Sequence, residues 1–402
     1  MMKAGATQPL LSIVIPTHER ARYALPTVRS LLETLPVEVE LVVADTSVGD
    51  SLTQALQALP QAARVRLVRP GHGLSVVDNF NAGLAHARGE FVLFLGDDDF
   101  VLPDVVPLLK EALCRGVDAL KFSFPALYHW PDFMHKRRGA TFAGTLHLSG
   151  FSGAIRPHDP VAALRAAARD LGGGVGEMPR VYAGVVSRGL LDRILAKHGA
   201  LFGGVSPDIY SATLIASESR HCVYIDYPVV VPGSSGASTA GQSAQGRHVG
   251  SLRNNAHIAP FQNLVWNPVV PEFYSVPTVW SYSLLAALER VPGMAQPAMG
   301  RLMARCLFYH RHYRAETLRS LGNWRRTAGL LTTGLELARG MGSELVWIGG
   351  KLRTLALQRV APRRSTVLNG LADTQAASAA LSAWLSACPT RLQPWPALSA
   401  QR

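Results

Sequence analysis

The first hundred residues alternate short apolar runs with amphipathic stretches, and this alternation restricts the possible folds more than any other feature. The apolar runs are each short enough to be one strand, and they lie at residues 11–15, 39–44, 65–68 and 90–95. Between them, apolar side chains recur at the spacing of one helix face in residues 24–34, 51–58 and 77–88. Strands that alternate with helices form right-handed βαβ units. The sequence therefore predicts an α/β fold whose mostly parallel sheet has helices on both faces.

Composition and the cysteines exclude several classes of protein. With 48% apolar and 17% charged residues among 402, the chain is too apolar for an intrinsically disordered protein. No apolar run approaches the roughly 18 residues that cross a bilayer, and the first residues lack the apolar stretch of a signal peptide. The four cysteines stand far apart without metal-binding spacing, so we expect reduced thiols and a cytoplasmic location.

The excess of basic residues is confined to one segment. The formal net charge of the chain is +12. By position it is −1 for residues 1–150, +1 for 151–289, +11 for 290–364 and +1 for 365–402. A protein that binds nucleic acid through its main fold is usually basic throughout that fold. We therefore expect no nucleic-acid binding, and the basic segment is a candidate surface for anionic lipid or for a protein partner.

Three of the predicted strands end in loops with polar residues, after Ile15, Ala44 and Leu95. Ligands of parallel α/β sheets bind beyond the carboxyl ends of the strands. The last of these loops contains three consecutive carboxylates, Asp97 to Asp99. They repel one another unless a hard divalent cation lies among them. The alternative is a solvated acidic turn in which Asp99 or a neighbour caps the next helix.

Four separate blocks of this region, taken in order, resemble family 2 glycosyltransferases of the GT-A fold. The blocks are residues 12–17, 42–47, 81–90 and 94–103. The resemblance implies a GT-A, Rossmann-like fold and an enzyme of the bacterial surface-polysaccharide type. It also implies a nucleotide-sugar site, with these residues: Pro16, Thr17, His18, Glu19, Asp45, Asp78, Asn81 and Asp97.

The acidic motif fits the family pattern in two frames. The pattern is Asp-x-Asp-Asp before a short apolar run and a proline; counted back from Pro103, its first acid falls on Gly96 and its second on Asp98. The resemblance then implies that Asp98 binds Mn²⁺ or Mg²⁺ and that Asp97 contacts ribose or the metal. In the other frame, Asp97 and Asp99 are the metal-binding pair. The glycine in place of the first acid predicts looser metal binding.

A further acidic residue precedes a helix in the second half of the predicted fold. Asp208 follows a turn of small residues and a proline, and an apolar helix comes after it. The helix dipole alone favours an acid at such a position. In the family the catalytic acid stands at this place, so the resemblance implies that Asp208 is the general base of an inverting transfer. Three consecutive residues of the same half either stack on a sugar ring or pack in an edge strand: Tyr128, His129 and Trp130.

We expect two domains. Residues 1–255 are predicted to form the GT-A domain, with a nucleotide-sugar-binding half at 10–125 and an acceptor half at 126–255. Residues 256–402 are predicted to form a basic, mainly helical C-terminal region.

Together these features predict a metal-dependent inverting glycosyltransferase. The expected donor is a nucleotide-diphosphate sugar, with a UDP-sugar as the first choice, and the expected acceptor is a hydroxyl of a glycan or a lipid-linked molecule in cell-surface polysaccharide synthesis. Residues 290–364 are predicted to hold the protein on the inner face of the membrane, with Trp324 and Trp347 in the lipid interface. Two other functions stay open: a sugar nucleotidyltransferase, and a non-catalytic protein that binds polyanions or a membrane surface.

Overall fold

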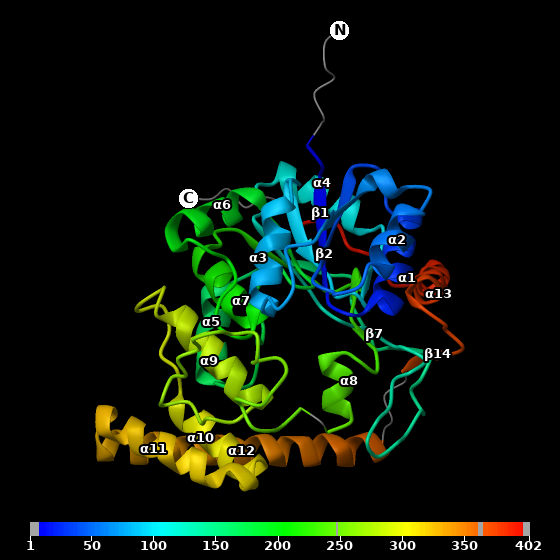
Figure 1. Cartoon of the computed structure of the whole chain (residues 1–402). Helices are drawn as coiled ribbons and strands as arrows, with labels where there is room; N and C mark the ends of the chain where they lie inside the picture. The colour runs from blue at the N-terminus through cyan, green and yellow to red at the C-terminus, as the bar shows by residue number, and fades with distance from the viewer. Residues whose placement is uncertain (1–7, 247, 361–364, 397–402) are drawn as a thin grey trace.

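A computed structural model of the chain describes residues 8–246, 248–360 and 365–396. Its centre is a mixed sheet that has eight strands within the described residues, in the order β3-β2-β1-β4-β10-β6-β11-β9 (Figure 1). The strands are β1 (Leu11–Thr17), β2 (Val39–Asp45), β3 (Val65–Val68), β4 (Phe91–Phe94), β6 (Ala119–Phe122), β9 (Ile155–His158), β10 (Val185–Ser187) and β11 (Cys222–Ile225). The first four run parallel, so the predicted βαβ half of the sheet is confirmed. β10 enters antiparallel between β4 and β6, and β9 is antiparallel to β11 at the edge.

Helices cover both faces of this sheet, as predicted. Side chains alternate along β1, so that Ile13 and Ile15 face one layer of helices and Val14 faces the other. The first layer contains α1 (Ala21–Thr34), α2 (Ser51–Gln57), α4 (Val105–Cys114) and α13 (Thr374–Ala387). The second layer contains α3 (Val76–His86), α6 (Arg188–His198) and α7 (Pro207–Glu218). Because both faces are packed, a ligand must approach the sheet at the ends of its strands.

Two smaller sheets connect distant parts of the chain. One contains β13 (Gly233–Ser234), β7 (Ala126–His129), β8 (Thr145–Leu148) and β14 (Thr366–Leu368), in this order, and the other joins β5 (Phe100–Val101) to β12 (Val230–Val231). Near the end of the chain, β14 pairs with β8, and α13 packs against α1, where the hydroxyls of Thr27 and Thr374 are 3.2 Å apart. Residues 366–387 therefore pack against the first half of the chain, and the domain division at residue 255 stays a prediction.

A second apolar core lies below the sheet in Figure 1, and the helices that contribute to it include α5 (Pro160–Arg169), α9 (Val276–Leu288), α10 (Met299–Tyr309) and α11 (Arg314–Ala328). The other helices and 3₁₀ turns outside the sheet layers are α8 (Thr239–Ala244), α12 (Leu330–Val360), η1 (Ala62–Arg64) and η2 (Arg311–Tyr313). α10 and α12 cross closely because glycines face each other: a Cβ on Gly340 would lie 2.2 Å from the carbonyl oxygen of Gly300. At this crossing the buried Glu344 forms salt bridges to Arg301 and Arg305, at 2.9 and 2.8 Å. Among the described residues, no helix has both the length and the apolar character that a membrane crossing requires.

The aromatic residues considered for sugar or lipid contact are largely buried. Tyr128, His129 and Trp130 are buried among other rings, so they pack rather than face a sugar. Trp324 is buried in the helical core, so the prediction that it enters a lipid interface is wrong. All four cysteines are free thiols, as expected.

Candidate functional site

The loop after β4 carries three buried carboxylates, each with its own hydrogen-bond partners. Asp97, Asp98 and Asp99 are 5%, 5% and 4% exposed. Asp97 accepts from the hydroxyl of Thr17 (Oγ1–Oδ2 2.7 Å) and from Nε of Arg20 (2.9 and 3.0 Å to its two oxygens). The cluster therefore lies where the loops after β1 and β4 meet, at the predicted carboxyl edge of the sheet.

A segment that precedes α8 closes the other side of the cluster. Oδ2 of Asp98 accepts from the backbone N–H and the hydroxyl of Ser235, at 3.0 and 2.7 Å. Asp99 accepts from the N–H groups of Gly233 (2.6 Å) and Gly96 (3.0 Å). Burial and the charge of Asp98 raise the pKa of Asp99 to about 7, although the two N–H donors act in the other direction.

Arg20 is the residue of this site that the sequence did not reveal. Its guanidinium bridges two carboxylates, with Nη2 2.8 Å from Oδ1 of Asp97 and 3.1 Å from Oδ2 of Asp98. Burial alone would lower the pKa of Arg20, but the two carboxylates outweigh burial and raise it. Burial raises the pKa of Asp97 to about 6 even though Arg20 lowers it. The only local indication in the sequence is that Arg20 directly follows the first loop. Because Arg20 and Asp97 are 77 positions apart, the sequence does not indicate that they pair.

The free oxygen atoms of the cluster indicate which carboxylate fits a divalent cation. Both oxygens of Asp97 and both oxygens of Asp99 accept hydrogen bonds. Oδ1 of Asp98 accepts none from the described residues and is not among the fully buried polar atoms. One or two carboxylates suffice for Mg²⁺ when substrate phosphates complete its coordination. The donor set therefore fits a cation on Asp98 rather than on the pair Asp97 and Asp99; in the described parts of the chain, no three His, Cys, Asp or Glu side chains converge as a metal site.

The glycine at the first position of the acidic motif is required by its surroundings. A Cβ on Gly96 would lie 2.6 Å from Oδ2 of Asp99 and 2.7 Å from the hydroxyl of Tyr182. Tyr182 reaches this point because it forms an isolated β-bridge with Phe94 at the end of β4, whereas β10 begins only at Val185. An acidic side chain at position 96 therefore has no room in this arrangement.

The loops after β1 and β2 are tied together and leave one carboxylate oxygen without a partner. The predicted residues of the first loop lie at the end of β1 and directly after it: Pro16, Thr17, His18 and Glu19. The backbone N–H of Glu19 donates to the hydroxyl of Ser47 (2.7 Å), and Nδ1 of His18 is 3.1 Å from Oγ1 of Thr46. Asp45 is buried; its Oδ1 accepts from the N–H of Ser47 (2.8 Å), while its Oδ2 has no partner in the described residues. Because a buried acceptor without a donor is unfavourable, this oxygen suits a ligand N–H or O–H group.

The site residues predicted on α3 have structural partners. Asp78 caps this helix, and its carboxylate accepts from the N–H and the hydroxyl of Ser75, at 3.0 and 2.7 Å. Asn81 donates to the carbonyl of Phe202 (3.1 Å). Between them, Asn79 was not predicted, and it donates to the carbonyl at position 44, near the end of β2 (3.1 Å). Contact of Asp78 and Asn81 with a nucleotide stays a prediction.

Asp208 lies in the first turn of α7 and has one carboxylate oxygen that is open. Its Oδ1 accepts from the hydroxyl of Ser206 (2.6 Å) and from the N–H of Ile209 (2.8 Å). Its Oδ2 accepts no hydrogen bond from the described residues and is not among the fully buried polar atoms. The turn before the helix is fixed because Ser283 accepts from the N–H of Ser206 (2.9 Å). A carboxylate that is held in place with one open oxygen suits a general base.

Arg180 connects the electrostatics of Asp208 with those of the acidic cluster. Its guanidinium carbon lies 4.9 Å from the ring centre of Phe124, and it makes no salt bridge with the described residues. Burial lowers the pKa of Arg180, whereas the negative charges of Asp208 and Asp99 raise it. Both carboxylates are therefore among the charges that act on this guanidinium.

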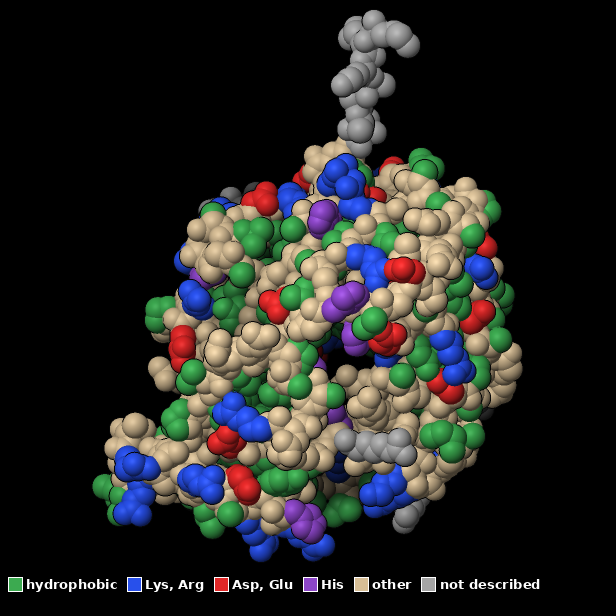
Figure 2. All heavy atoms as spheres, in the orientation of Figure 1, with side chains coloured by type: hydrophobic (Ala, Val, Ile, Leu, Met, Phe, Trp, Pro, Cys, Tyr) green, Lys and Arg blue, Asp and Glu red, His purple; other side chains and the backbone are tan. Residues whose placement is uncertain are grey.

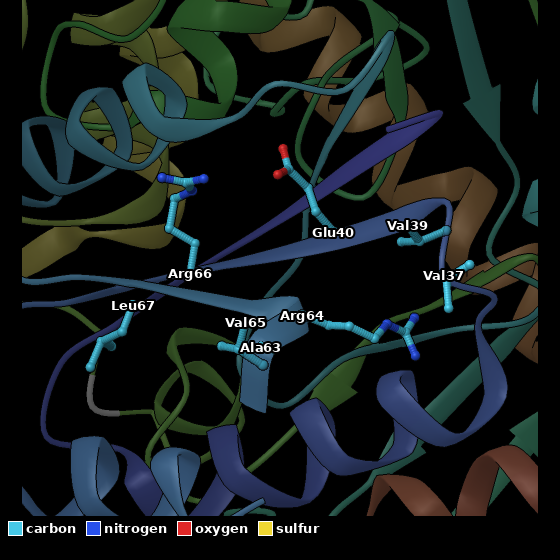
Figure 3. A pocket seen from close by; sticks show the side chains of 8 residues that line it. All are labelled: Val37, Val39, Glu40, Ala63, Arg64, Val65, Arg66 and Leu67. Atoms are coloured by element: carbon cyan, nitrogen blue, oxygen red, sulfur yellow. The ribbon is translucent and has the colours of Figure 1, made fainter. Parts of the chain in front are cut away.

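Two hollows in the described part of the molecule bear on where a ligand binds. Figure 2 shows a hollow near the middle of the molecule, between the sheet and the helices below it. The other, of about 530 Å³, lies at the amino ends of β2 and β3 (Figure 3). Its lining residues are Val37, Val39, Glu40, Ala63, Arg64, Val65, Arg66 and Leu67. Because ligands of such sheets bind at the carboxyl ends of the strands, this second hollow is not the candidate site.

Comparison with known proteins gives a match to one family. The sequence profile of Glycosyl transferase family 2 matches residues 12–160. The chondroitin synthase and the hyaluronan synthase of Pasteurella multocida are each 29% identical over 142 residues, which are 32% of this chain. The matched part spans only 15% and 14% of the length of these two relatives. The crystal structure of S. aureus TarS 1–349 in complex with UDP-GlcNAc is 15% identical with a TM-score of 0.43, and the alignment covers 79% of this chain and 92% of TarS 1–349.

Proposed function

Residues 12–160 of this chain are a glycosyltransferase family 2 domain, and from this premise we propose that the protein transfers a sugar from a nucleotide-diphosphate sugar to a hydroxyl group. The observation that carries the proposal is that two carboxylates each have one open oxygen. Oδ1 of Asp98 is open in the acidic cluster after β4, and Oδ2 of Asp208 is open at the start of α7. The first suits the neutralisation of a diphosphate, and the second suits the removal of a proton.

We assign the role of general base to Asp208. Its open Oδ2 takes the proton of the acceptor hydroxyl while that oxygen attacks the anomeric carbon of the sugar. The bond from the sugar to the diphosphate breaks in the same step, and the nucleoside diphosphate leaves on the opposite face. The configuration at the anomeric carbon is therefore inverted. Ser206 and the N–H of Ile209 donate to Oδ1 of Asp208. These two hydrogen bonds fix the orientation of the carboxylate and leave Oδ2 for the acceptor hydroxyl.

We assign the metal to Asp98, because its Oδ1 is the open carboxylate oxygen of the cluster. Mn²⁺ or Mg²⁺ bound there would also bind the donor diphosphate, and it would neutralise the negative charge of the diphosphate as it leaves. Arg20 fixes Asp97 and one oxygen of Asp98. Arg180 makes no salt bridge with a carboxylate of the described residues, so its positive charge is available to an anionic donor.

We assign the nucleoside part of the donor to the loops after β1 and β2. Oδ2 of Asp45 is a buried acceptor with no partner among the described residues, which suits a nucleobase N–H or a ribose hydroxyl. Thr17 reaches from the same edge to Asp97, so the loop that meets the nucleoside also contacts the acidic cluster. A UDP-sugar is the first donor to test.

We propose that the acceptor is a glycan or a lipid-linked molecule in cell-surface polysaccharide synthesis. The support is the names of two relatives, a chondroitin synthase and a hyaluronan synthase. We also propose that the protein works at the inner face of the membrane, because residues 290–364 carry a net charge of +11. A sugar nucleotidyltransferase is the less favoured candidate, since β1 leads into Pro16-Thr17-His18-Glu19 and not into a basic, glycine-rich phosphate loop.

The proposal is tested with a panel of nucleotide sugars, each with Mn²⁺, with Mg²⁺ and with a chelator. We expect one class of donor to raise the melting temperature and to release nucleoside diphosphate, more strongly with metal than with chelator. Asp45→Asn should weaken the thermal shift, whereas Asp192→Asn on the exposed side of α6 should not change it. A protein that responds to no donor under any of these conditions would contradict the proposal. Release of pyrophosphate from a nucleoside triphosphate and a sugar phosphate would favour the nucleotidyltransferase.

A further inference from the structure

The longest helix, α12, presents a stripe of apolar and small side chains to the solvent. The members of the stripe are spaced alternately four and three residues apart, and all are exposed: Leu331, Leu335, Ala338, Gly342, Leu345, Gly349, Leu352 and Ala356. The exposed fractions of its four leucines are 82%, 60%, 59% and 62%. Alternate spacings of four and three place residues on one side of a helix. An outer helix normally presents polar residues on this side, so an apolar stripe of this length indicates a surface that is covered in use.

The opposite side of α12 already has its packing partners. Gly340 lies against Gly300 of α10, and the buried Glu344 forms salt bridges to Arg301 and Arg305. The residues of this packed side therefore hold the helix on the protein, and the exposed stripe is not needed for that contact. From position 351 to position 357 all side chains are exposed, so the last turns described lie free of the helical core.

Exposed basic residues accompany the apolar stripe. They lie on α11 and α12: Arg314, Arg319, Arg325, Arg326, Arg339, Lys351 and Arg353. The salt bridges of this helical layer use Arg301 and Arg305 instead, and none of the exposed bases pairs with an acid in the described residues. Figure 2 shows Lys and Arg side chains along the lower edge of the molecule, the edge at which Figure 1 places α10, α11 and α12.

We propose that the outward stripe of α12 docks the protein on the surface of an anionic lipid bilayer, with the helix parallel to the membrane plane. The leucines would enter the boundary between head groups and acyl chains, and the exposed arginines and lysine would contact lipid phosphates. Apolar burial and attraction between basic residues and anionic lipid are the two contributions that hold amphipathic helices at an interface.

Charge favours a lipid surface over a second copy of this chain. Residues 290–364 contain 14 basic and 3 acidic residues. Two copies that met through α12 would bring these like charges together, and no excess of acidic residues on this layer would offset the repulsion. An anionic bilayer supplies the opposite charge over the whole length of the helix.

The docked orientation also suits the proposed acceptor. In Figure 1 the chain enters β1 from the top, so the carboxyl ends of the parallel strands point down toward α8 and the helical layer. A bilayer under α12 would therefore lie on the same side of the sheet as the candidate site. The link to a lipid-linked acceptor rests on the proposed function, whereas the docking itself does not depend on sugar transfer.

Flotation of the full chain with vesicles tests the docking. One vesicle population is phosphatidylcholine alone, and the other also contains phosphatidylglycerol. We expect the protein to float with the anionic vesicles and to be released by salt. The triple variant Leu331→Gln, Leu335→Gln, Leu352→Gln should lower the partition coefficient about tenfold or more. Val37→Gln is the matched control, because Val37 is 86% exposed at the other end of the molecule.

A second variant keeps the test decisive if the triple variant is unstable. Arg339→Gln with Arg353→Gln changes only exposed side chains, and it should weaken binding to anionic vesicles without lowering the melting temperature. Failure of the wild-type protein to float with anionic vesicles would overturn the inference. So would a dimer in sedimentation that the leucine variant separates, because a second copy would then cover the stripe. An inactive protein that floats would count against the proposed function only.

Discussion

Arg20 holds both carboxylate oxygens of Asp97, with its Nε 2.9 Å from Oδ1 and 3.0 Å from Oδ2. The same guanidinium reaches Asp98 through Nη2 (3.1 Å). The positive charge of Arg20 therefore lies between two of the three carboxylates that the sequence predicts to bind a metal. This arrangement relieves their repulsion without a divalent cation, and it leaves one oxygen of Asp98 for a ligand.

Arg20→Met should therefore destabilise the protein and strengthen its response to metal. Removal of one partner leaves Asp97 and Asp98 buried without a cation, which costs about 3 kcal/mol of unfolding free energy. Mn²⁺ should raise the melting temperature of the variant more than that of the wild type, because the cation can replace the lost charge. Denaturant unfolding and thermal shifts measure both effects. Arg22→Met is the control, since the side chain of Arg22 is 68% exposed; equal behaviour of the two variants would contradict the prediction.

The sequence predicted the features that lie within one short segment, and it did not predict contacts between residues that are far apart along the chain. The parallel strands were predicted because each is one apolar run, and the three carboxylates because they are adjacent. The partners of those carboxylates were not predicted: Arg20 lies 77 residues before Asp97, and Ser235 lies 137 residues after Asp98. An arginine directly after the first loop does not by itself indicate a carboxylate partner so far along the chain. For the same reason, the antiparallel insertion of β10 and the return of β14 to β8 could not be read from periodicity.

Gly96→Ala should lower the stability by steric conflict. A methyl group at this position would lie 2.6 Å from Oδ2 of Asp99 and 2.7 Å from the Tyr182 hydroxyl, both in a buried site. Overpacking of this kind costs about 2 kcal/mol. Gly49→Ala is the control, because no atom lies within 4 Å of a Cβ there. Chemical denaturation compares the two, and a Gly96→Ala protein as stable as the Gly49→Ala protein would show that the loop after β4 relaxes freely.

Asp208→Asn should separate catalysis from donor binding. The amide cannot take a proton from the acceptor, so turnover should fall by ~10² or more. Donor binding should stay near the wild-type level, because the nucleoside loops lie after β1 and β2 and do not include Asp208. Initial rates and donor-induced thermal shifts measure the two quantities on the same protein. Asp192→Asn, on the exposed side of α6, controls for the loss of a negative charge. Retained turnover in Asp208→Asn would remove this residue from the mechanism.

His129 should make the protein less stable in acid. It is buried with Nδ1 unpartnered in the described residues, and its ring centre lies 4.5 Å from that of Phe133. Burial, together with the charge of His147, lowers the pKa of His129 from 6.5 to about 4. The unfolded chain therefore binds this proton first, so the contribution of the neutral ring is complete above the unfolded pKa and is lost as the pH falls toward the folded pKa.

The expected loss from this residue at about pH 5 is roughly 2 kcal/mol of unfolding free energy. His129→Gln should remove that part of the pH dependence, so the stability of the wild type relative to the variant should be about 2 kcal/mol lower at about pH 5 than at about pH 7.5. Urea unfolding at both pH values measures the difference. His312→Gln is the control, because His312 is exposed in η2. A stability difference between wild type and His129→Gln that is the same at both pH values would show that His129 does not titrate differently in the folded protein.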